Sequence, residues 1–99
     1  MNTFTIRVVL HEGTWQDYFA LEEDLAKKGI VDVIAGSDGN AYKMPPAEYN
    51  YIGPETIEQV REMARASAAK IGKFKQVFVT QASQQAWVGL EVVQQRRTA

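Results

Sequence analysis

The chain contains no cysteine, so it has neither a disulfide framework nor a thiolate metal site. Its single histidine, His11, excludes any metal centre that needs two imidazoles, and no H-E-x-x-H spacing occurs. No apolar run approaches the roughly 20 residues that a membrane helix requires. Residues 1–12 also lack the basic leader and small-residue cleavage pattern of a signal peptide. These absences predict a cytoplasmic protein with no membrane partner.

The remaining composition is that of an ordinary globular domain. The 99 residues are 45% hydrophobic and 23% charged, far from the low hydrophobicity and high charge of disordered chains. A chain of this length closes one hydrophobic core, so residues 1–99 are expected to form a single domain. Charge is uneven, since residues 1–60 carry 4 basic and 10 acidic groups and residues 61–99 carry 7 and 2. The basic C-terminal part fits either an anionic partner or an ordinary solvated helix.

The first expected elements are a strand and an amphipathic helix. Residues 3–10 (TFTIRVVL) place apolar side chains at every second position, which is typical of a half-buried strand. Thr14 and Asp17 have the spacing of a helix capping box, and Gly29 offers a left-handed stop. The sequence therefore predicts a strand over 3–10 and a helix from about 14 to 28.

A hairpin is expected next. The apolar run 31–34 ends at the turn residues 36–40 (GSDGN), which predict a hairpin into residues 41–44. Pro45 and Pro46 cannot donate to a neighbouring strand, so they should mark a bulge, an edge or a short loop. A third strand is predicted over residues 47–52.

The second half should contain a helix and two strands. Gly53-Pro54 begins the predicted helix and Gly72 ends it. Its apolar stripe consists of Ile57, Val60, Ala64, Ala68 and Ile71. Residues 74–80 are rich in strand formers, and after a turn at 82–85 the run 86–93 should form a further strand in a C-terminal hairpin. Residues 94–99 are expected to be a frayed tail.

The order of these elements predicts an α+β fold of the ferredoxin-like β-α-β-β-α-β type. Such a fold packs two helices on one face of an antiparallel sheet, here with an extra strand at the C-terminal end. It hosts many activities, so function has to be argued from individual side chains.

Few residues suggest catalysis. His11 and Glu12 end the first strand, where an imidazole or a carboxylate can act as a general base in a cleft, and we take them as positional candidates for catalysis. Asp38 is expected to bond its own turn rather than a metal. Glu48 either faces water or pairs with a base, and the sequence does not decide between these. No metal site is indicated.

Two sets of side chains suggest nucleic-acid contact. Aromatic residues in strands can stack bases, although core packing or a dimer interface is the commoner use of such residues. The aromatic candidates are Tyr49, Tyr51, Phe78 and Trp87. Basic residues can contact an RNA backbone, although lysines and arginines also occupy any solvated helix. The basic candidates for nucleic-acid binding are Arg61, Arg65, Lys70, Lys73 and Lys75, with Arg96 and Arg97 in the tail.

Part of the sequence resembles a known family. The resemblance rests on Gly36-Ser37-Asp38-Gly39, Tyr42, Met44-Pro45, Ala47-Glu48-Tyr49, Tyr51 and Gly53, and extends to Ile71-Gly72-Lys73, Val77-Phe78-Val79-Thr80 and Trp87-Val88-Gly89-Leu90. These residues are similar to a pattern in small bacterial and phage proteins grouped with the GhoS antitoxins. The founding antitoxins belong to type V toxin-antitoxin systems and are ferredoxin-like endoribonucleases, similar to the small adaptation nuclease of CRISPR systems.

The resemblance implies an RNA-interacting protein, with cleavage of single-stranded RNA as the expected activity. No cofactor is expected other than the Mg²⁺ that a nuclease would use. A homodimer through sheet edges or faces is expected as well, since small ferredoxin-like domains often associate in this way. Enzymes of the CRISPR type carry an acidic residue after the first strand, where this chain has His11 and Glu12. The alternative is a non-enzymatic protein-binding module whose exposed sheet face, aromatics and Pro45-Pro46 edge engage another protein.

Overall fold

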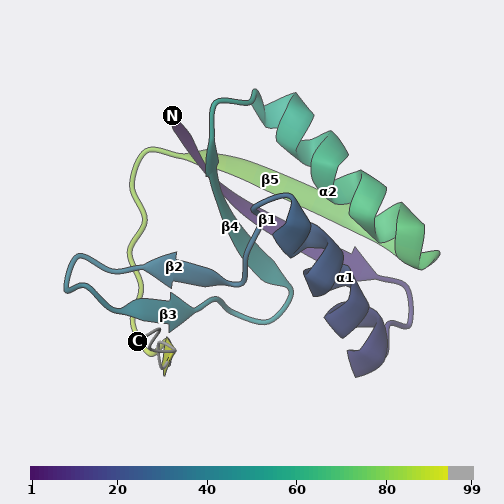
Figure 1. Ribbon diagram of the computed structural model, residues 1–99, viewed down its shortest axis with the longest axis horizontal. Helices are drawn as coiled ribbons and strands as arrows, with labels where there is room; N and C mark the ends of the chain where they lie inside the picture. Colours follow the sequence, from purple (N-terminus) through teal and green to yellow (C-terminus); the bar gives the residue numbers. More distant parts are fainter. Residues whose placement is uncertain (94–99) are drawn as a thin grey trace.

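The computed structural model describes residues 1–93, which form two helices and six strands (Figure 1). The elements are β1 (Asn2–Leu10), α1 (Trp15–Lys27), β2 (Val33–Ala35), β3 (Ala41–Lys43), β4 (Glu48–Gly53), α2 (Ile57–Ile71), β5 (Phe74–Ala82) and β6 (Val92–Val93). The tail expected to fray, residues 94–99, lies outside the described residues, and so do Arg96 and Arg97.

β1 is the central strand of the main sheet, whose order is β4–β1–β5. Both neighbours run antiparallel to β1, and Ile6 lies opposite Tyr49 on one side and Val79 on the other. α1 and α2 lie on the same side of this sheet (Figure 1). The predicted α+β class with antiparallel strands is confirmed.

The hairpin expected from residues 31–44 leaves the main sheet. β2 and β3 pair with each other and belong to a separate sheet of order β2–β3–β6. Only one bridge joins this segment to β4: Val31 N donates to Asn50 O at 3.0 Å, and Asn50 N donates to Val31 O at 2.8 Å. Pro45 has no N–H to donate, so the β3 ladder ends at the prolines and the chain reaches β4 through a loop. The expectation of one sheet is therefore corrected to two.

The predicted C-terminal hairpin is also wrong. Only Val92 and Val93 of the run 86–93 form a strand, and they pair with β3 rather than with β5. Trp87 packs against Tyr42 of β3, with ring centroids 5.5 Å apart, and Lys43 N donates to Glu91 O at 2.9 Å. These contacts carry the segment after β5 across to the second sheet, so the extra strand exists but lies elsewhere.

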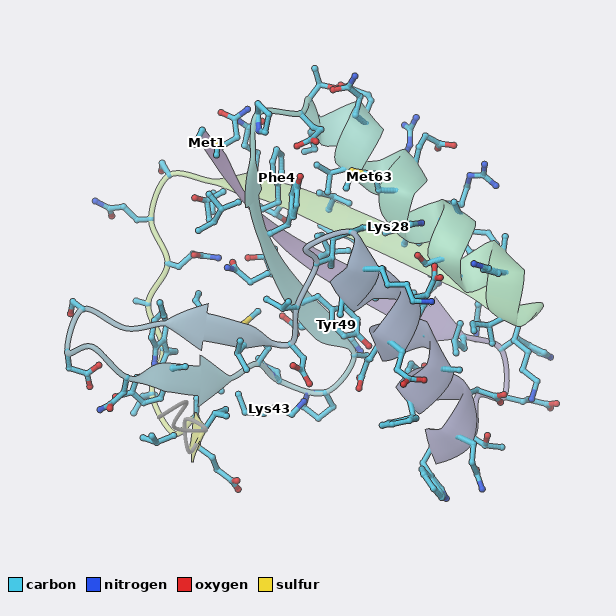
Figure 2. All side chains as sticks on the ribbon, in the orientation of Figure 1. Met1, Phe4, Lys28, Lys43, Tyr49 and Met63 are labelled. Carbon is cyan, nitrogen blue, oxygen red and sulfur yellow. The ribbon has the colours of Figure 1, made fainter. Side chains whose placement is uncertain are left out.

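The hydrophobic core lies between the main sheet and the two helices. β1 contributes every second residue, and Phe4 stacks on Tyr51 of β4 with centroids 6.1 Å apart (Figure 2). The predicted stripe of α2 is confirmed: Val60, Ala64 and Ala68 are fully buried, and Ile57 and Ile71 pack against the same core. α1 adds the buried side chains Leu21 and Leu25.

Polar contacts fix the two helices to each other. Asp24 of α1 accepts a hydrogen bond from the hydroxyl of Ser67, a buried residue of α2, at 2.7 Å. It also forms an ion pair with Lys70 of α2, with Nζ 3.1 Å from the carboxylate. These two donors, the hydroxyl first, lower the pKa of Asp24 below its usual value. Lys28 Nζ pairs with Asp24 and donates to the carbonyl of Met63 at 2.9 Å (Figure 2).

Both helices begin at capping boxes. Thr14 caps α1 together with Asp17, as predicted, and Thr56 caps α2 together with Gln59. α2 therefore starts at Ile57 rather than at Gly53-Pro54, because Thr56 supplies the acceptor that the first free N–H groups need. Its end is as predicted, with Gly72 in the left-handed conformation at φ 84°.

The Thr56 cap gives a first prediction. Thr56→Ala removes the hydroxyl that accepts from Gln59 N at 3.1 Å, and it should lower the free energy of unfolding by about 1 kcal/mol. Thr56→Ser, which keeps the hydroxyl, should cost only a fraction of that. Urea denaturation of the three proteins measures both effects, and equal losses in the two variants would contradict the capping role.

Candidate nucleic-acid interface

The β5 side of the main sheet exposes an aromatic ring beside a guanidinium. Phe78 lies directly opposite Arg7 in the β1–β5 register, so both side chains are on the same face. Their strand neighbours Ile6 and Val79 point the other way, towards the helices. Phe78 is 70% exposed, and the Arg7 side chain is 55% exposed. Gln76 and Thr80, both exposed, flank Phe78 on this face.

The rest of this face is covered on its β4 side. Gln85, from the segment after β5, donates from Nε2 to Thr5 Oγ1 at 2.8 Å and to Asn50 Oδ1 at 3.3 Å. Asn50 is only 6% exposed as a result. Arg7 pairs with Glu48 of β4 at 3.4 Å, which settles the role left open for that carboxylate. The uncovered part of the face is therefore a strip along β1 and β5 that runs past Arg7 and Phe78.

His11 and Glu12 form the turn after β1 and lie in solvent. His11 Nε2 is 3.9 Å from Glu12 Oε1, with side chains 68% and 85% exposed. A backbone hydrogen bond from His11 N to Lys73 O, 2.7 Å long, fixes the start of this turn. Within the turn Glu12 adopts a positive φ of 49°. Within residues 1–93 no group of three or more metal-ligating side chains comes together. The two candidates are thus exposed neighbours beside the start of β5.

Four of the five basic candidates are paired with carboxylates. Arg61 and Arg65 both bind Glu62, at 3.1 and 2.9 Å, and they lower its pKa, Arg65 first. Lys70 binds Asp24 at 3.1 Å and Lys73 binds Asp17 at 2.7 Å. Lys75 is exposed and makes no ion pair with any other residue in the range 1–93. The set is divided between α2 and the start of β5, so the structure does not gather it into one cluster.

The ion pair at Asp17 gives a prediction about pH. Lys73 Nζ and Thr14 donate hydrogen bonds to this carboxylate, Lys73 contributing most, and its pKa falls from 3.8 to about 2. A lowered pKa in the folded state means that this contribution to stability is complete above 3.8 and is lost as the pH falls towards 2. Lys73→Met should therefore raise the pKa of Asp17 towards 3.8 in a carboxyl NMR titration. An unchanged titration curve would contradict the pairing.

Two of the four aromatic candidates are wrong. Tyr49 and Tyr51 share a strand face as expected, but that face is the core side, where they are 1% and 9% exposed. Burial, together with Glu22 as acceptor of its hydroxyl at 3.0 Å, raises the pKa of Tyr49 well above its usual value (Figure 2). Trp87 is half-buried against Tyr42. Only Phe78 of the four is a largely exposed ring.

Asp38 has the structural role predicted for it. Its Oδ1 accepts from Asn40 N at 3.0 Å, and its other oxygen accepts from the Tyr42 hydroxyl. The Tyr42 hydroxyl, followed by Asn40 N, lowers the pKa of Asp38. The turn between β2 and β3 is therefore held by its own side chains.

A further hollow lies elsewhere on the described part of the chain and is mostly apolar. It measures about 640 Å³ and is bordered by Tyr18, Glu22, Lys43, Pro45 and Leu90, among others. Of its charged side chains, Glu22 accepts from Tyr49 and Lys43 binds Asp32 at 2.7 Å. The third is Glu91, and Lys43, the basic residue in the lining, is thus already paired.

No family model, curated protein or solved structure matches this chain. The resemblance to the GhoS antitoxins therefore stays a prediction. Among residues 1–93 neither helix is long and apolar enough to cross a bilayer.

One exposed pair was missed by the sequence analysis. Trp15 and Phe19 lie one turn apart on α1 and are 74% and 57% exposed. The spacing i,i+4 at the start of a predicted helix could have shown that they share a face. The core uses another face of the helix, where Tyr18, Leu21 and Leu25 recur at helical spacing, and Leu21 and Leu25 are buried there as that spacing predicts.

Proposed function

We propose that this protein binds single-stranded RNA on the strip of sheet formed by β1 and β5. The observation that carries the proposal is the exposed Phe78 directly opposite Arg7. A ring on an open sheet face can stack a base, and an arginine beside it can stack or bind a phosphate. Gln76 and Thr80 add hydrogen-bonding groups on the same face.

The proposal includes a ferredoxin-like fold in which the second strand is reduced to one bridge. Two arrangements support it. β5, β1, β4 and Val31 follow one another across the main sheet, and each neighbouring pair is antiparallel. α1 connects β1 to Val31, and α2 connects β4 to β5. Sheets of this kind use their helix-free face for single-stranded nucleic acid.

RNA cleavage is the second part of the proposal, in keeping with the resemblance to the GhoS antitoxins. His11 and Glu12 lie beside the start of β5, so RNA that follows the strip towards Lys75 would pass them. An imidazole can serve as general base for a ribose hydroxyl, and a carboxylate can help to hold Mg²⁺ together with substrate phosphates. Both side chains are exposed and accessible to such a strand.

The test is an anisotropy titration with a labelled pool of single-stranded RNA at low and high salt. We expect saturable binding that weakens as salt rises, because cations on the protein displace counterions from RNA. Binding that is absent at low salt would contradict the proposal. The same RNA incubated with Mg²⁺ tests cleavage, which should be lost in His11→Ala and Glu12→Gln if these residues act.

A protein-binding module is the alternative function, and one observation favours it. Trp15 and Phe19 are both exposed one turn apart on α1, and exposed aromatics are common anchors of protein interfaces. Of the two aromatics that would anchor a partner on the sheet face, Tyr49 is buried and Trp87 is half-buried against Tyr42. A Trp15→Ala variant that keeps full RNA affinity separates this patch from the RNA site.

A further inference from the structure

The outer edge of β5 is open. β5 is the last strand of the β4–β1–β5 sheet, and within residues 1–93 no strand pairs with its free side. Over nine residues it carries one charge, Lys75, and no proline, and its one irregularity against β1 lies at its start, beside Lys75. Natural sheets usually protect a long edge with prolines, bulges or several charges, because its free N–H and C=O groups recruit other strands. The opposite edge, at β4, is partly closed by the bridge to Val31.

An apolar groove runs along the same edge on the helix side. It measures about 230 Å³ and is lined by Ile57, Glu58, Arg61, Val77 and Val79. Val77 and Val79 point towards the helices, yet they remain half-exposed because nothing in the described chain lies beyond β5. A strand added at this edge would place its own helix-side residues next to these valines.

We propose that the added strand is β5 of a second copy of this chain, paired antiparallel about a two-fold axis at Phe78. Phe78 is the middle residue of β5, so the regular stretch from Gln76 to Thr80 is matched against itself. In this register Val77 lies opposite the partner's Val79 and Gln76 opposite the partner's Thr80. The two Lys75 residues lie at opposite ends of this stretch, so no like charges meet.

The pairing accounts for the exposure of residues on both faces of β5. On the helix side the four valines close the two grooves, and on the open side the two Phe78 rings become neighbours in a six-stranded sheet. A cross-strand aromatic pair of this kind stabilises a sheet beyond its buried area. The two Arg7–Phe78 strips also become continuous. The dimer itself does not depend on RNA binding.

The absence of cysteine allows a direct test of the register. Phe78→Cys places one thiol in each copy on the two-fold axis, where paired Cβ atoms are about 5 Å apart. Mild oxidation should give a covalent dimer of twice the 11.1 kDa chain mass. Thr80→Cys is the matched control, because residues 80 lie about 13 Å apart or more along the strands and cannot be bridged. Equal yields from the two variants, or no covalent dimer from Phe78→Cys, would overturn the proposal.

Charge substitutions test the same register without cross-linking. In sedimentation equilibrium at micromolar concentration the unmodified chain should have twice the mass of 11.1 kDa. Gln76→Lys with Thr80→Lys puts like charges opposite each other twice and should return the mass to that of one chain. Gln76→Glu with Thr80→Lys makes both contacts attractive and should keep the dimer. A monomeric unmodified chain, or a dimer that ignores the paired lysines, would overturn the inference.

Discussion

Phe4→Ala should lower the free energy of unfolding by about 3–5 kcal/mol, which is the usual cost of emptying a fully buried aromatic site. Phe4 is 0% exposed in the central strand, and its ring stacks on Tyr51. Removing it leaves a cavity between β1, β4 and α2 that the rigid sheet cannot close. Since small domains are stable by only about 5–15 kcal/mol, this loss is a large share of the total.

The matched control is a second phenylalanine that the structure leaves in solvent. Phe78→Ala removes the same atoms from a side chain that is 70% exposed, so it should cost less than about 1 kcal/mol. Urea denaturation of both variants gives the two values directly. Similar losses at the two positions would mean that the assignment of the β1 and β5 faces is wrong.

Phe78→Ala should weaken the binding of single-stranded RNA by about 5- to 150-fold. The estimate follows from about 1–3 kcal/mol for one base stacked on an aromatic ring. The variant should remain folded, and its mass in sedimentation equilibrium separates the loss of a stacking ring from the loss of the Phe78 pair in the dimer. Arg7→Gln should weaken binding as well and reduce its salt dependence, since it removes a charge from the same strip.

Phe19→Ala is the control for that experiment. Phe19 is 57% exposed but lies on α1, on the helix side of the sheet, so its loss should leave RNA affinity unchanged. If Phe19→Ala weakens binding as much as Phe78→Ala, stacking on the sheet face is not the source of the affinity. The RNA proposal would then fail, whatever the oligomeric state of the protein.

Local patterns in the sequence determine most of the elements. The alternation in residues 3–10 comes from a strand with one buried face, and the stripe of α2 comes from a helix with one buried side. Thr14 and Gly72 mark helix ends because they satisfy backbone groups within a few residues of themselves. Each of these features involves only neighbours in the chain.

The parts that the sequence did not predict depend on distant contacts. Period-two alternation placed Tyr49 and Tyr51 on one face, but it does not say which face the helices cover. Asn50 is buried because Gln85, 35 residues away, bonds to it across the sheet. The route of residues 83–91 likewise follows the packing of Trp87 on Tyr42, which no local turn signal encodes.

The candidate RNA site could be predicted only in part from the sequence, because it too depends on contacts between distant residues. His11 and Glu12 are adjacent in sequence, so their proximity was certain, whereas their exposure was not. The pairing of Arg7 with Phe78 needs the β1–β5 register, which joins residues 71 positions apart. The basic residues could be named, but the carboxylates that pair with Lys70 and Lys73 come from α1.

The central claim is that RNA lies on the open face of β1 and β5. The most direct test is to add a short single-stranded RNA to ¹⁵N-labelled protein and follow the backbone amide NMR signals. The largest shifts are expected at Arg7, Gln76, Phe78 and Thr80, and they should fade as salt is raised. Shifts confined to Arg61 and Arg65 on α2, or no shifts at low salt, would contradict the account.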